Sequence, residues 1–388
     1  MNSFKSKKNF FFITGSRAEY GLLKDLINSF KNDKKISTNL VVTGSHLLKK
    51  FGKTINEINN DKIKVFKKIK IFSKTDNPKD ISISSTKVIN GLSNIFEKKK
   101  PDLLVVLGDR YEIFLSCFVA TLFRVPIAHI CGGEETIGSY DNQFRHAITK
   151  MAHIHFVTNK FYKKKVERMG ENKKKVFNVG SLAFSNFDKL KFNNKFDLQK
   201  KYKFKLRKEN FLVTIHSETL EKFPSKKRLK IIFNTFEKFK DFSFIFTAAN
   251  SDQGGNEINR LIKNFIKKKI NMYFIDSFGK EDYFSMIRLV SGVIGNSSSG
   301  IIEVPYFTKG SINLGQRQLG RISSKSVINV DYNQKDLSRS ILKIISKKFK
   351  LKIKKNLSPY YKKNTIRNIK KVLTKTNLEN ITLKRFNF

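Results

Sequence analysis

The chain has little cysteine and no long apolar stretch. Its 388 residues include only two cysteines, Cys117 in an apolar segment and Cys131 beside two glycines. These two residues provide neither a disulfide framework nor the spacing of a zinc site. The sequence contains no apolar run of about eighteen residues, as a membrane-spanning helix needs, and no signal-peptide pattern. We therefore expect a cytoplasmic protein without a membrane partner or a bound metal.

Acidic residues are also scarce. The chain has 32 Asp and Glu against 78 Lys and Arg, which gives a formal net charge of +46. Such a charge is typical of proteins that bind nucleic acid or an anionic surface. Here, however, the lysines are scattered along the whole chain, and no stacking motif or separate basic helix stands out. We favour lysines on solvated faces, which would still attract an anionic substrate, and keep nucleic-acid binding as the non-enzymatic alternative.

The length and the order of predicted elements indicate two α/β domains. Strand and helix patterns alternate in both halves, which is typical of doubly wound parallel sheets. We expect strands at residues 10–14, 37–43, 103–107, 126–130 and 176–179, and at 211–215, 242–247, 272–275 and 292–295. The predicted fold is a pair of Rossmann-like domains that face a cleft, as in GT-B-like nucleotide-sugar enzymes.

The predicted domain boundaries follow from the same alternation. Residues 1–183 form the N-terminal Rossmann-like domain, and residues 209–358 form a C-terminal Rossmann-like domain that binds a nucleotide. The polar, lysine-rich residues 184–208 are predicted to link them. Residues 359–388 are expected to form a helix that crosses back to the first domain, followed by a basic tail.

Charged residues gather where two buried strands of the first half end. Asp109 and Arg110 follow one strand, Glu134 follows the next after a glycine pair, and Asp141 comes shortly afterwards. Ligands of open parallel sheets bind outside the carboxyl ends of the strands, so both turns should open at one site. Three acids there need cationic partners, and clusters of this kind are common in acid–base sites. We predict that Asp109, Glu134 and Asp141 are catalytic.

A serine-rich turn in the second half is a candidate phosphate site. Ser297 and Ser298 follow a strand and open a helix, where hydroxyls, backbone N–H groups and the helix dipole could hold a diphosphate. An N-capping serine cluster is the simpler alternative. Glu303 could accept a hydrogen bond from a ribose hydroxyl, and Arg317 could pair with phosphate, although single charges of this type are often merely solvated.

Three further polar residues lie in strand-end turns. His216 follows a strand of the second half, and Arg17 and His46 occupy equivalent positions in the first. Their location favours ligand binding, but a structural role stays equally open for each of them.

Other polar residues have simpler explanations. His153 and His155 have the spacing of a strand, and we interpret them as packing and edge positions rather than as a metal pair. Glu19 and Lys24 could form a pair on a helix surface.

Seven motifs, taken in order, resemble those of the hydrolysing UDP-N-acetylglucosamine 2-epimerases, and the resemblance covers residues 11 to about 331. Each motif alone is weak, but seven with compatible spacing are specific. Non-hydrolysing relatives carry Glu-Ala-Gly-Leu-Arg where this chain has Cys-Gly-Gly-Glu at residues 131–134, which favours the hydrolysing branch. The motifs are Gly-Ser-Arg-Ala-Glu-Tyr at 15–20, Gly-Ser-His-Leu at 44–47, Gly-Asp-Arg at 108–110, Gly-Gly-Glu at 132–134, Arg-His-Ala-Ile-Thr-Lys at 145–150, Ile-Gly-Asn-Ser-Ser-Ser-Gly at 294–300 and Ile-Asn-Leu-Gly-Gln-Arg-Gln-Leu-Gly-Arg at 312–321.

The resemblance implies an enzyme that converts a UDP-sugar and water to the free 2-epimeric sugar and a nucleoside diphosphate, without a cofactor. The sugar would be N-acetylglucosamine or a 2,4-diacetamido-6-deoxy relative, on UDP or GDP. Asp109, Glu134 and His216 would surround the sugar, with His216 a further catalytic residue that protonates the leaving group or the ring, and uracil would lie near residues 276–278. The residues that we predict to bind substrate or nucleotide are Arg17, His46, Arg110, His146, His216, Asn250, Phe278, Ser297, Ser298, Glu303 and Arg317. A homodimer or a higher homo-oligomer is expected.

The sequence departs from the family pattern at two places. The family often shows two consecutive acids before the Arg-His-Ala-Ile-Thr motif, whereas this chain has Asp141 followed by Asn142, which cannot act as a base. Residues 360–366 lack the glycines that usually precede the final helix. A GT-B-like glycosyltransferase, which would share the nucleotide contacts but need an acceptor pocket, stays the alternative enzyme.

Overall fold

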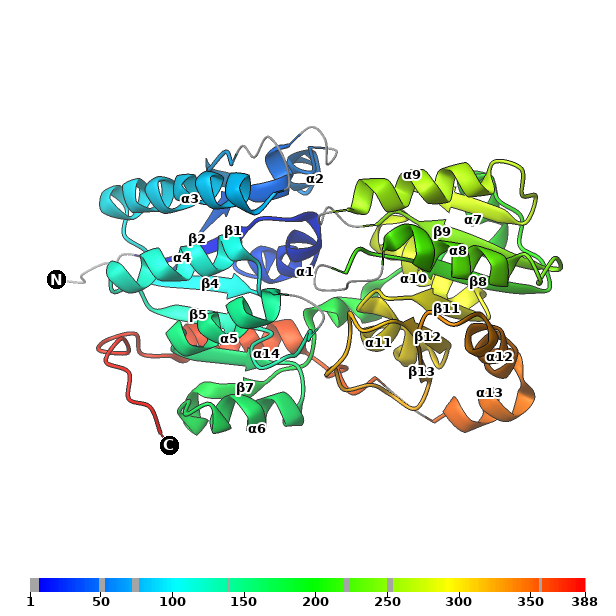
Figure 1. Cartoon of the computed structure of the whole chain (residues 1–388). Helices are drawn as coiled ribbons and strands as arrows, with labels where there is room; N and C mark the ends of the chain where they lie inside the picture. The colour runs from blue at the N-terminus through cyan, green and yellow to red at the C-terminus, as the bar shows by residue number, and fades with distance from the viewer. Residues whose placement is uncertain are drawn as a thin grey trace. The chain divides into compact units, whose positions relative to one another are not determined.

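The computed structural model of the chain describes residues 7–48, 53–71, 77–137, 140–218, 224–249, 254–355 and 358–387. The chain forms two compact units. Unit 1 contains Met1–Glu134, Asp141–Ser185 and Lys362–Phe388, and unit 2 contains Glu135–Tyr140 and Asn186–Tyr361. Each unit is built on a parallel sheet with helices interleaved between the strands (Figure 1). The predicted class of two doubly wound α/β domains is therefore confirmed.

Unit 1 contains a seven-stranded parallel sheet in the order β3-β2-β1-β4-β5-β6-β7. Short runs of Phe, Ile, Leu and Val form its central strands because both faces of such a sheet are covered by helices. The strands are β1 (Lys8–Thr14), β2 (Ile36–Val42), β3 (Val65–Lys68), β4 (Leu103–Leu107), β5 (Ile127–Ile130), β6 (Ile154–Val157) and β7 (Val176–Asn178). The helices are α1 (Arg17–Asn28), α2 (Ile55–Asn60), α3 (Pro78–Lys98), α4 (Tyr111–Leu122), α5 (Asp141–Met151), α6 (Lys160–Arg168) and α14 (Thr365–Lys375), with short 3-10 turns that include η1 (Gly44–Leu47) and η4 (Leu182–Phe184).

The two faces of this sheet bury separate hydrophobic cores. Phe10 and Phe12 of β1 pack with residues of α1 and α14, whereas Phe11 and Ile13 pack with residues of α3, α4 and α5. This split follows from the pleat of the strand, in which successive side chains point to opposite faces. Helices thus cover the central strand β1 on both faces.

Unit 2 contains a six-stranded parallel sheet in the order β10-β9-β8-β11-β12-β13. Phenylalanines fill much of its core, where the rings of Phe236 and Phe244 stack at 3.9 Å. The strands are β8 (Glu209–Thr214), β9 (Phe242–Thr247), β10 (Met272–Ile275), β11 (Gly292–Gly295), β12 (Gly310–Leu314) and β13 (Val327–Val330). The helices are α7 (Lys195–Tyr202), α8 (Ser225–Phe236), α9 (Gly255–Ile266), α10 (Gly279–Leu289), α11 (Ser299–Ile302), α12 (Gln334–Ile345) and α13 (Lys347–Ile353), with the 3-10 turns η5 (Phe187–Lys189) and η6 (Val304–Phe307).

The segment that we interpreted as a linker contains a helix. Asn194 caps α7 by accepting a hydrogen bond from the Asp197 N–H at 3.0 Å. Tyr202 and Lys201 of this helix then bind the Asp282 carboxylate of α10 at 2.6 and 2.7 Å. Residues 195–202 are therefore fastened to unit 2.

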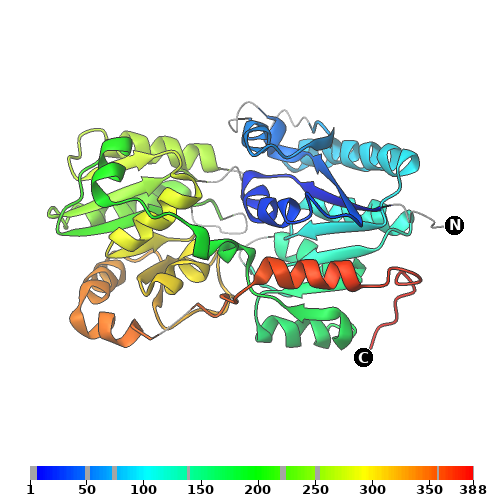
Figure 2. The same ribbon diagram turned by 180° about the vertical axis from the view of Figure 1, so that it is seen from behind.

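The last helix of the chain packs on unit 1. Figure 2 shows α14 beside α1, in the same layer of the unit. Lys370 donates to the Ser29 carbonyl at 2.6 Å and pairs with Asp33, and the Thr365 hydroxyl donates to the Val179 carbonyl at 2.8 Å. These contacts fix α14 across one face of the first sheet.

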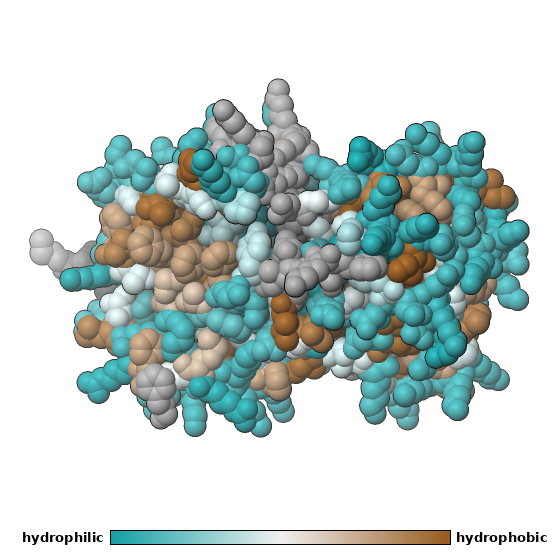
Figure 3. Space-filling view, viewed as in Figure 1, coloured by the Kyte–Doolittle hydropathy of each residue, from teal (hydrophilic) through white to brown (hydrophobic). Residues whose placement is uncertain are grey.

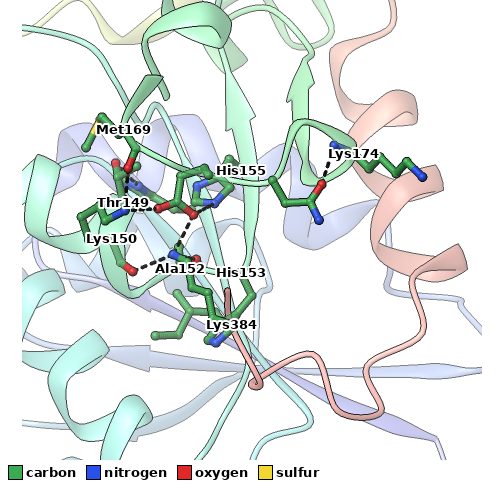
Figure 4. A network of polar contacts seen from close by, with 12 residues as sticks. Thr149, Lys150, Ala152, His153, His155, Met169, Lys174 and Lys384 are labelled. Carbon is green, nitrogen blue, oxygen red and sulfur yellow. Dashed lines mark hydrogen bonds and ion pairs between the residues drawn. The ribbon is translucent and has the colours of Figure 1, made fainter. Parts of the chain in front are cut away.

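A buried acid anchors the segment that follows α14. The Glu171 carboxylate contacts Lys150, His155 and Lys384 at 3.0, 3.0 and 2.7 Å, and Figure 4 shows these three side chains converging. Lys384 also donates to the carbonyls of Lys150 and Ala152 at the end of α5, both at 2.6 Å. The C-terminal segment thus holds the end of the helix that carries Arg145.

Most of the face in Figure 3 is hydrophilic, and apolar side chains gather over the part of unit 1 formed by α3 and α4. Phe118 and Leu122 of α4 are among the exposed apolar residues.

No helix in the described ranges combines the length and apolar character that crossing a membrane requires. The homo-oligomer stays a prediction.

Candidate functional site

A buried arginine of unit 1 contacts one predicted acid and the backbone of another. Arg145, the fifth residue of α5, forms an ion pair with Asp109 after β4 and donates to the backbone carbonyl of Glu134 after β5 at 3.0 Å. The Glu134 carboxylate accepts from the Thr158 hydroxyl at 2.8 Å. The side chain of Arg145 is 4% exposed and that of Asp109 is 22% exposed. Arg145 therefore links the turn that carries Asp109 to the turn that carries Glu134, and Asp109 is the acid that solvent reaches.

A neutral histidine supports the turn that carries Asp109. His129 of β5 is fully buried, and its Nε2 lies 2.8 Å from the Gly108 carbonyl. Burial lowers the pKa of His129 to about 3, so Nε2 carries the proton and donates it to that carbonyl. A Cβ on Gly132 would stand 3.0 Å from His129 Nδ1 and from the Thr149 hydroxyl. Glycine at this position lets the β5 turn close over the histidine.

Asp141 and His146 lie on the same helix as Arg145. Asp141 is the first residue of α5, and His146 directly follows Arg145. Both side chains are half-buried. Asn142 is the second residue of this helix.

The turns after β1 and β2 place Arg17 and His46 differently. Arg17 begins α1, is half exposed, and binds Glu57 at 2.8 Å. His46 is fully buried, with Nε2 3.1 Å from the Thr14 hydroxyl and Nδ1 2.8 Å from the Thr54 hydroxyl. Burial lowers the pKa of His46 to about 4, so this imidazole is neutral at physiological pH.

Glu19 is buried, and the surface pair with Lys24 that we expected is wrong. The Glu19 carboxylate accepts from the N–H groups of Gly15 and Ser16 at 2.7 and 3.0 Å, so it forms a capping box at the start of α1. Lys24 binds Asp61 instead. Glu19 thus faces the interior of the unit below the β1 turn, because its side chain satisfies helix N–H groups that have no partner within α1.

Arg110 lies beside a second buried acid. Its guanidinium grips the Glu112 carboxylate at 3.2 and 3.3 Å, and the side chain of Glu112 is 1% exposed. Arg110 is the N-cap residue of α4, so it projects from the same turn as Asp109.

In unit 2, one asparagine side chain joins two predicted site segments. Asn296, fully buried after β11, accepts from the His216 N–H at 2.7 Å and donates to the His216 carbonyl at 2.9 Å. Its own carbonyl accepts from Arg317 and Gln318 at 3.2 and 3.0 Å. The segments that carry His216, Ser297, Ser298 and Arg317 therefore meet at the carboxyl end of β8, β11 and β12.

Gly295 makes that meeting possible. Its φ is +142°, and a Cβ at this position would lie 1.9 Å from the Thr214 carbonyl oxygen. The backbone of β11 can approach β8 at this closeness only with glycine there.

The serine turn opens a very short helix. The serine turn was predicted to open a helix, and α11 covers only Ser299–Ile302 before the 3-10 turn η6 begins, because Pro305 interrupts the α-helical bonding. The helix dipole therefore contributes less to anion binding than the sequence suggests. Glu303 lies at this junction, burial raises its pKa, and its Oε2 is buried without a hydrogen-bond partner.

Phe278 is buried in unit 2. The ring of Phe278 is buried and packs against Tyr202 at 4.6 Å, while its carbonyl accepts from the Tyr202 hydroxyl. Asn250 lies outside the described residues.

His153 and His155 both contact protein groups of unit 1. His155 binds Glu171, and His153 Nδ1 accepts from the Ile127 N–H at 3.1 Å. Within the part of the chain that the structure describes, no three His, Cys, Asp or Glu side chains are grouped so as to hold a metal ion.

Known proteins resemble this chain in sequence and in fold. The family described as UDP-N-acetylglucosamine 2-epimerase matches residues 28–374. GDP/UDP-N,N'-diacetylbacillosamine 2-epimerase (hydrolyzing) of Campylobacter jejuni is 39% identical over 346 residues, which cover 89% of each chain. Polysialic acid biosynthesis protein P7 of Escherichia coli is 37% identical, over 94% of this chain and 93% of its relative. The crystal structure of UDP-GlcNAc 2-epimerase from Neisseria meningitidis bound to UDP-GlcNAc shares the fold, with a TM-score of 0.81 over 95% of this chain and 100% of that one at 17% identity.

Proposed function

Because the chain belongs to the UDP-N-acetylglucosamine 2-epimerase family, we propose that it is a hydrolysing nucleotide-sugar 2-epimerase. Its substrate would be a 2-acetamido sugar on UDP or GDP, and its products the free 2-epimeric sugar and the nucleoside diphosphate. The Cys-Gly-Gly-Glu turn at residues 131–134 and the 39% identical relative support the hydrolysing branch.

The observation that carries this proposal is that Arg145 pairs with the Asp109 carboxylate and also binds the backbone carbonyl of Glu134, so the turns that carry both acids lie at one edge of the sheet. Inversion at C2 needs one group to remove a proton and another to return one to the opposite face of the ring. Two acids on separate turns at one sheet edge can supply both transfers. Arg145 holds the Asp109 carboxylate in place and balances its charge.

The proposed reaction has two steps. First, a carboxylate takes the proton from C2 while the C1–O bond to the diphosphate breaks, which leaves a C1–C2 double bond in a 2-acetamidoglycal. Water then adds its oxygen to C1, and a proton returns to the opposite face of C2. Asp109 and Glu134 would carry these protons with Asp141 beside them, and His216 would protonate the leaving group or the ring.

The leaving diphosphate needs cations and hydrogen-bond donors, because negative charge develops on it as the C1–O bond breaks. We assign this role to Arg17, Arg110 and Arg317 together with Ser297 and Ser298. Glu303 has a buried oxygen without a protein partner, which suits a ribose hydroxyl as its ligand. His46 and His146 would support the sugar side from unit 1.

The relatives favour a diacetamido sugar as the first substrate to test. The Campylobacter relative is named for diacetylbacillosamine, and a Neisseria meningitidis UDP-N-acetylglucosamine 2-epimerase is more distant at 28% identity. We therefore propose UDP- or GDP-N,N'-diacetylbacillosamine ahead of UDP-N-acetylglucosamine.

The test is a proton NMR assay of these nucleotide sugars in deuterated water, with excess EDTA and no acceptor. We expect a free 2-epimer that carries deuterium at C2, together with the nucleoside diphosphate. Glu134→Gln serves as the inactive control. A nucleotide sugar that reacts only when an acceptor is added would favour the glycosyltransferase alternative. Product that keeps all of its protium at C2 would exclude the elimination route.

A further inference from the structure

Glu19 and Glu112 are buried carboxyl groups of unit 1 for which the proposed mechanism has no use. Glu19 is 6% exposed and the side chain of Glu112 is 1% exposed. Both flank Gly15, since a Cβ there would stand 3.3 Å from Glu112 Oε1 and 3.5 Å from Glu19 Oε2. Two acids so close together in the interior cannot both remain ionised without compensation.

The compensation for this pair is incomplete. Arg110 grips both oxygens of Glu112, whereas Glu19 receives only the N–H groups of Gly15 and Ser16 on one oxygen. The other oxygen of Glu19, Oε1, is buried and has no hydrogen-bond partner. An ionised carboxylate usually binds donors with both oxygens, so a protonated Glu19 fits this environment better.

The titratable groups around Glu19 come from two segments. Glu112, Arg110 and Asp109 face it from the turn between β4 and α4, and the neutral His46 lies in the turn after β2. Burial raises the pKa of Glu19 to about 8; Glu112 and Asp109 act in the same direction, and Arg110 opposes them. Arg110 is thus the cation on which ionisation of Glu19 depends.

The pair lies directly under the loops that we assign to the diphosphate. A Cβ on Gly44 would stand 2.4 Å from the Gly15 carbonyl and 2.8 Å from Glu112 Oε1, so the turns after β1 and β2 close tightly over it. Arg17 begins the helix that Glu19 caps. A bound diphosphate would therefore place several negative charges close to Arg110 and Glu19.

We propose that Glu19 couples binding of the nucleoside diphosphate to the uptake of one proton from solvent. The positive charge of Arg110 stabilises the ionised form of Glu19, and a diphosphate bound at Arg110 neutralises that charge. Ionised Glu19 then becomes less stable, so its carboxylate accepts a proton when the ligand binds. Glu19 acts through Arg110 and the loop it caps, so it is a positioning residue. This inference rests on the proposed function, because it takes a diphosphate as the ligand at Arg110.

The test is titration calorimetry with UDP at pH 8.5 in buffers of different ionisation enthalpy. The slope of the observed enthalpy against buffer enthalpy gives the protons taken up per UDP. At this pH the phosphates of UDP are fully ionised and contribute no proton. We expect uptake of about half a proton or more at pH 8.5 and almost none at pH 7, where Glu19 is already protonated.

Two variants locate the proton. Glu19→Gln should bind UDP without proton uptake, whereas Glu97→Gln, the same substitution at an exposed site on α3, should keep the uptake of the wild type. Wild-type UDP binding without uptake would overturn the inference and leave the proposed function standing, and so would unchanged uptake in Glu19→Gln. Absence of UDP binding in the wild type would instead refute the proposed function.

A second measurement serves if Glu19→Gln does not fold. The dissociation constant of UDP for the wild type should be constant from pH 7 to 8 and rise above pH 8 by up to about tenfold per pH unit. An affinity that stays flat between pH 7 and 9 would also overturn the inference.

Discussion

Replacing Asp109 by asparagine tests the central acid of unit 1. The amide keeps the shape of the side chain but can neither take a proton nor balance the charge of Arg145. Loss of one acid–base group typically costs about two orders of magnitude in turnover. We therefore expect kcat to fall at least about a hundredfold while the affinity for UDP stays near that of the wild type.

The same substitution should lower stability by a moderate amount. Removing one partner of a fully buried ion pair costs about 3–5 kcal/mol, but Asp109 is 22% exposed, and Arg145 keeps its hydrogen bond to the Glu134 carbonyl. We expect a loss of about 1–3 kcal/mol, which lowers Tm by several degrees. Circular dichroism, calorimetry with UDP and steady-state kinetics measure the three effects separately.

Asp102→Asn is the matched control for this experiment. Asp102 precedes the same strand, β4, at its opposite end, where it is exposed and accepts from the Asn9 N–H at 2.7 Å. This variant should keep wild-type turnover and lose less than about 1 kcal/mol. Turnover of Asp109→Asn within a few fold of the wild type would remove Asp109 from the mechanism.

Two further substitutions test the nucleotide site and the C-terminal anchor. Glu303→Gln should weaken UDP binding about tenfold and leave kcat nearly unchanged, because a ribose contact acts equally in the ground and transition states; unchanged UDP affinity would contradict the assignment. The ion pairs and hydrogen bonds of Glu171 outweigh its burial and lower its pKa from 4.5 to about 2. The stabilisation is therefore complete above about pH 4.5 and is lost as pH falls toward 2. Glu171→Gln should cost about 2–4 kcal/mol at pH 7, whereas Glu167→Gln, in a more exposed pair with Lys163, should cost less than about 1 kcal/mol. Equal unfolding free energies for these two variants would contradict the buried role of Glu171.

The sequence was sufficient for the positions of the acids but not for their partners. Asp109 and Glu134 follow apolar runs that only buried strands explain, so their place at one sheet edge could be predicted. Arg145 lies 36 residues from Asp109 on a helix whose rotation no local pattern determines. The ion pair between Arg145 and Asp109 can therefore be recognised only in the folded structure, where α5 packs against the sheet.

The sequence around Glu19 fits both a surface pair and a capping box, and only the capping box is found in the structure. Spacing of five residues from Lys24 and a helical context suggested a surface pair, but Ser16 and Glu19 also have the spacing of a capping box. The capping interpretation would have placed the carboxylate on the backbone of the β1 turn. Asn296 gave no comparable signal, because its contacts with His216 join segments 80 residues apart.

Three strands were missed because they lack a plain apolar run. In β3, Val65 and Phe66 are followed by two lysines, as befits a charged edge strand. Gly310, Ser311 and Asn313 interrupt the apolar pattern of β12, although every residue of that strand is buried. Ser311 of β12 lies against Gly300 of the serine turn, since a Cβ on Gly300 would stand 2.5 Å from the Ser311 hydroxyl. In β13, only Val330 is fully buried. β12 therefore contains small and polar residues, which fit close packing against the serine turn. These residues hide the apolar pattern by which a strand is recognised in a sequence.

The scarcity of arginine in so basic a chain is informative about the site. Only 14 of the 78 basic residues are arginines, so lysine serves at most positions where a solvated positive charge suffices. Arg145, Arg110 and Arg317 instead use the guanidinium geometry: Arg145 joins two turns, Arg110 grips both oxygens of Glu112, and Arg317 reaches the Asn296 carbonyl. A lysine ammonium cannot reproduce a planar fork of this kind. In a lysine-rich sequence, an arginine beside a strand end is therefore a stronger candidate for a site residue than its charge alone indicates. The positions of Arg145, Arg110 and Arg317 are consistent with this rule.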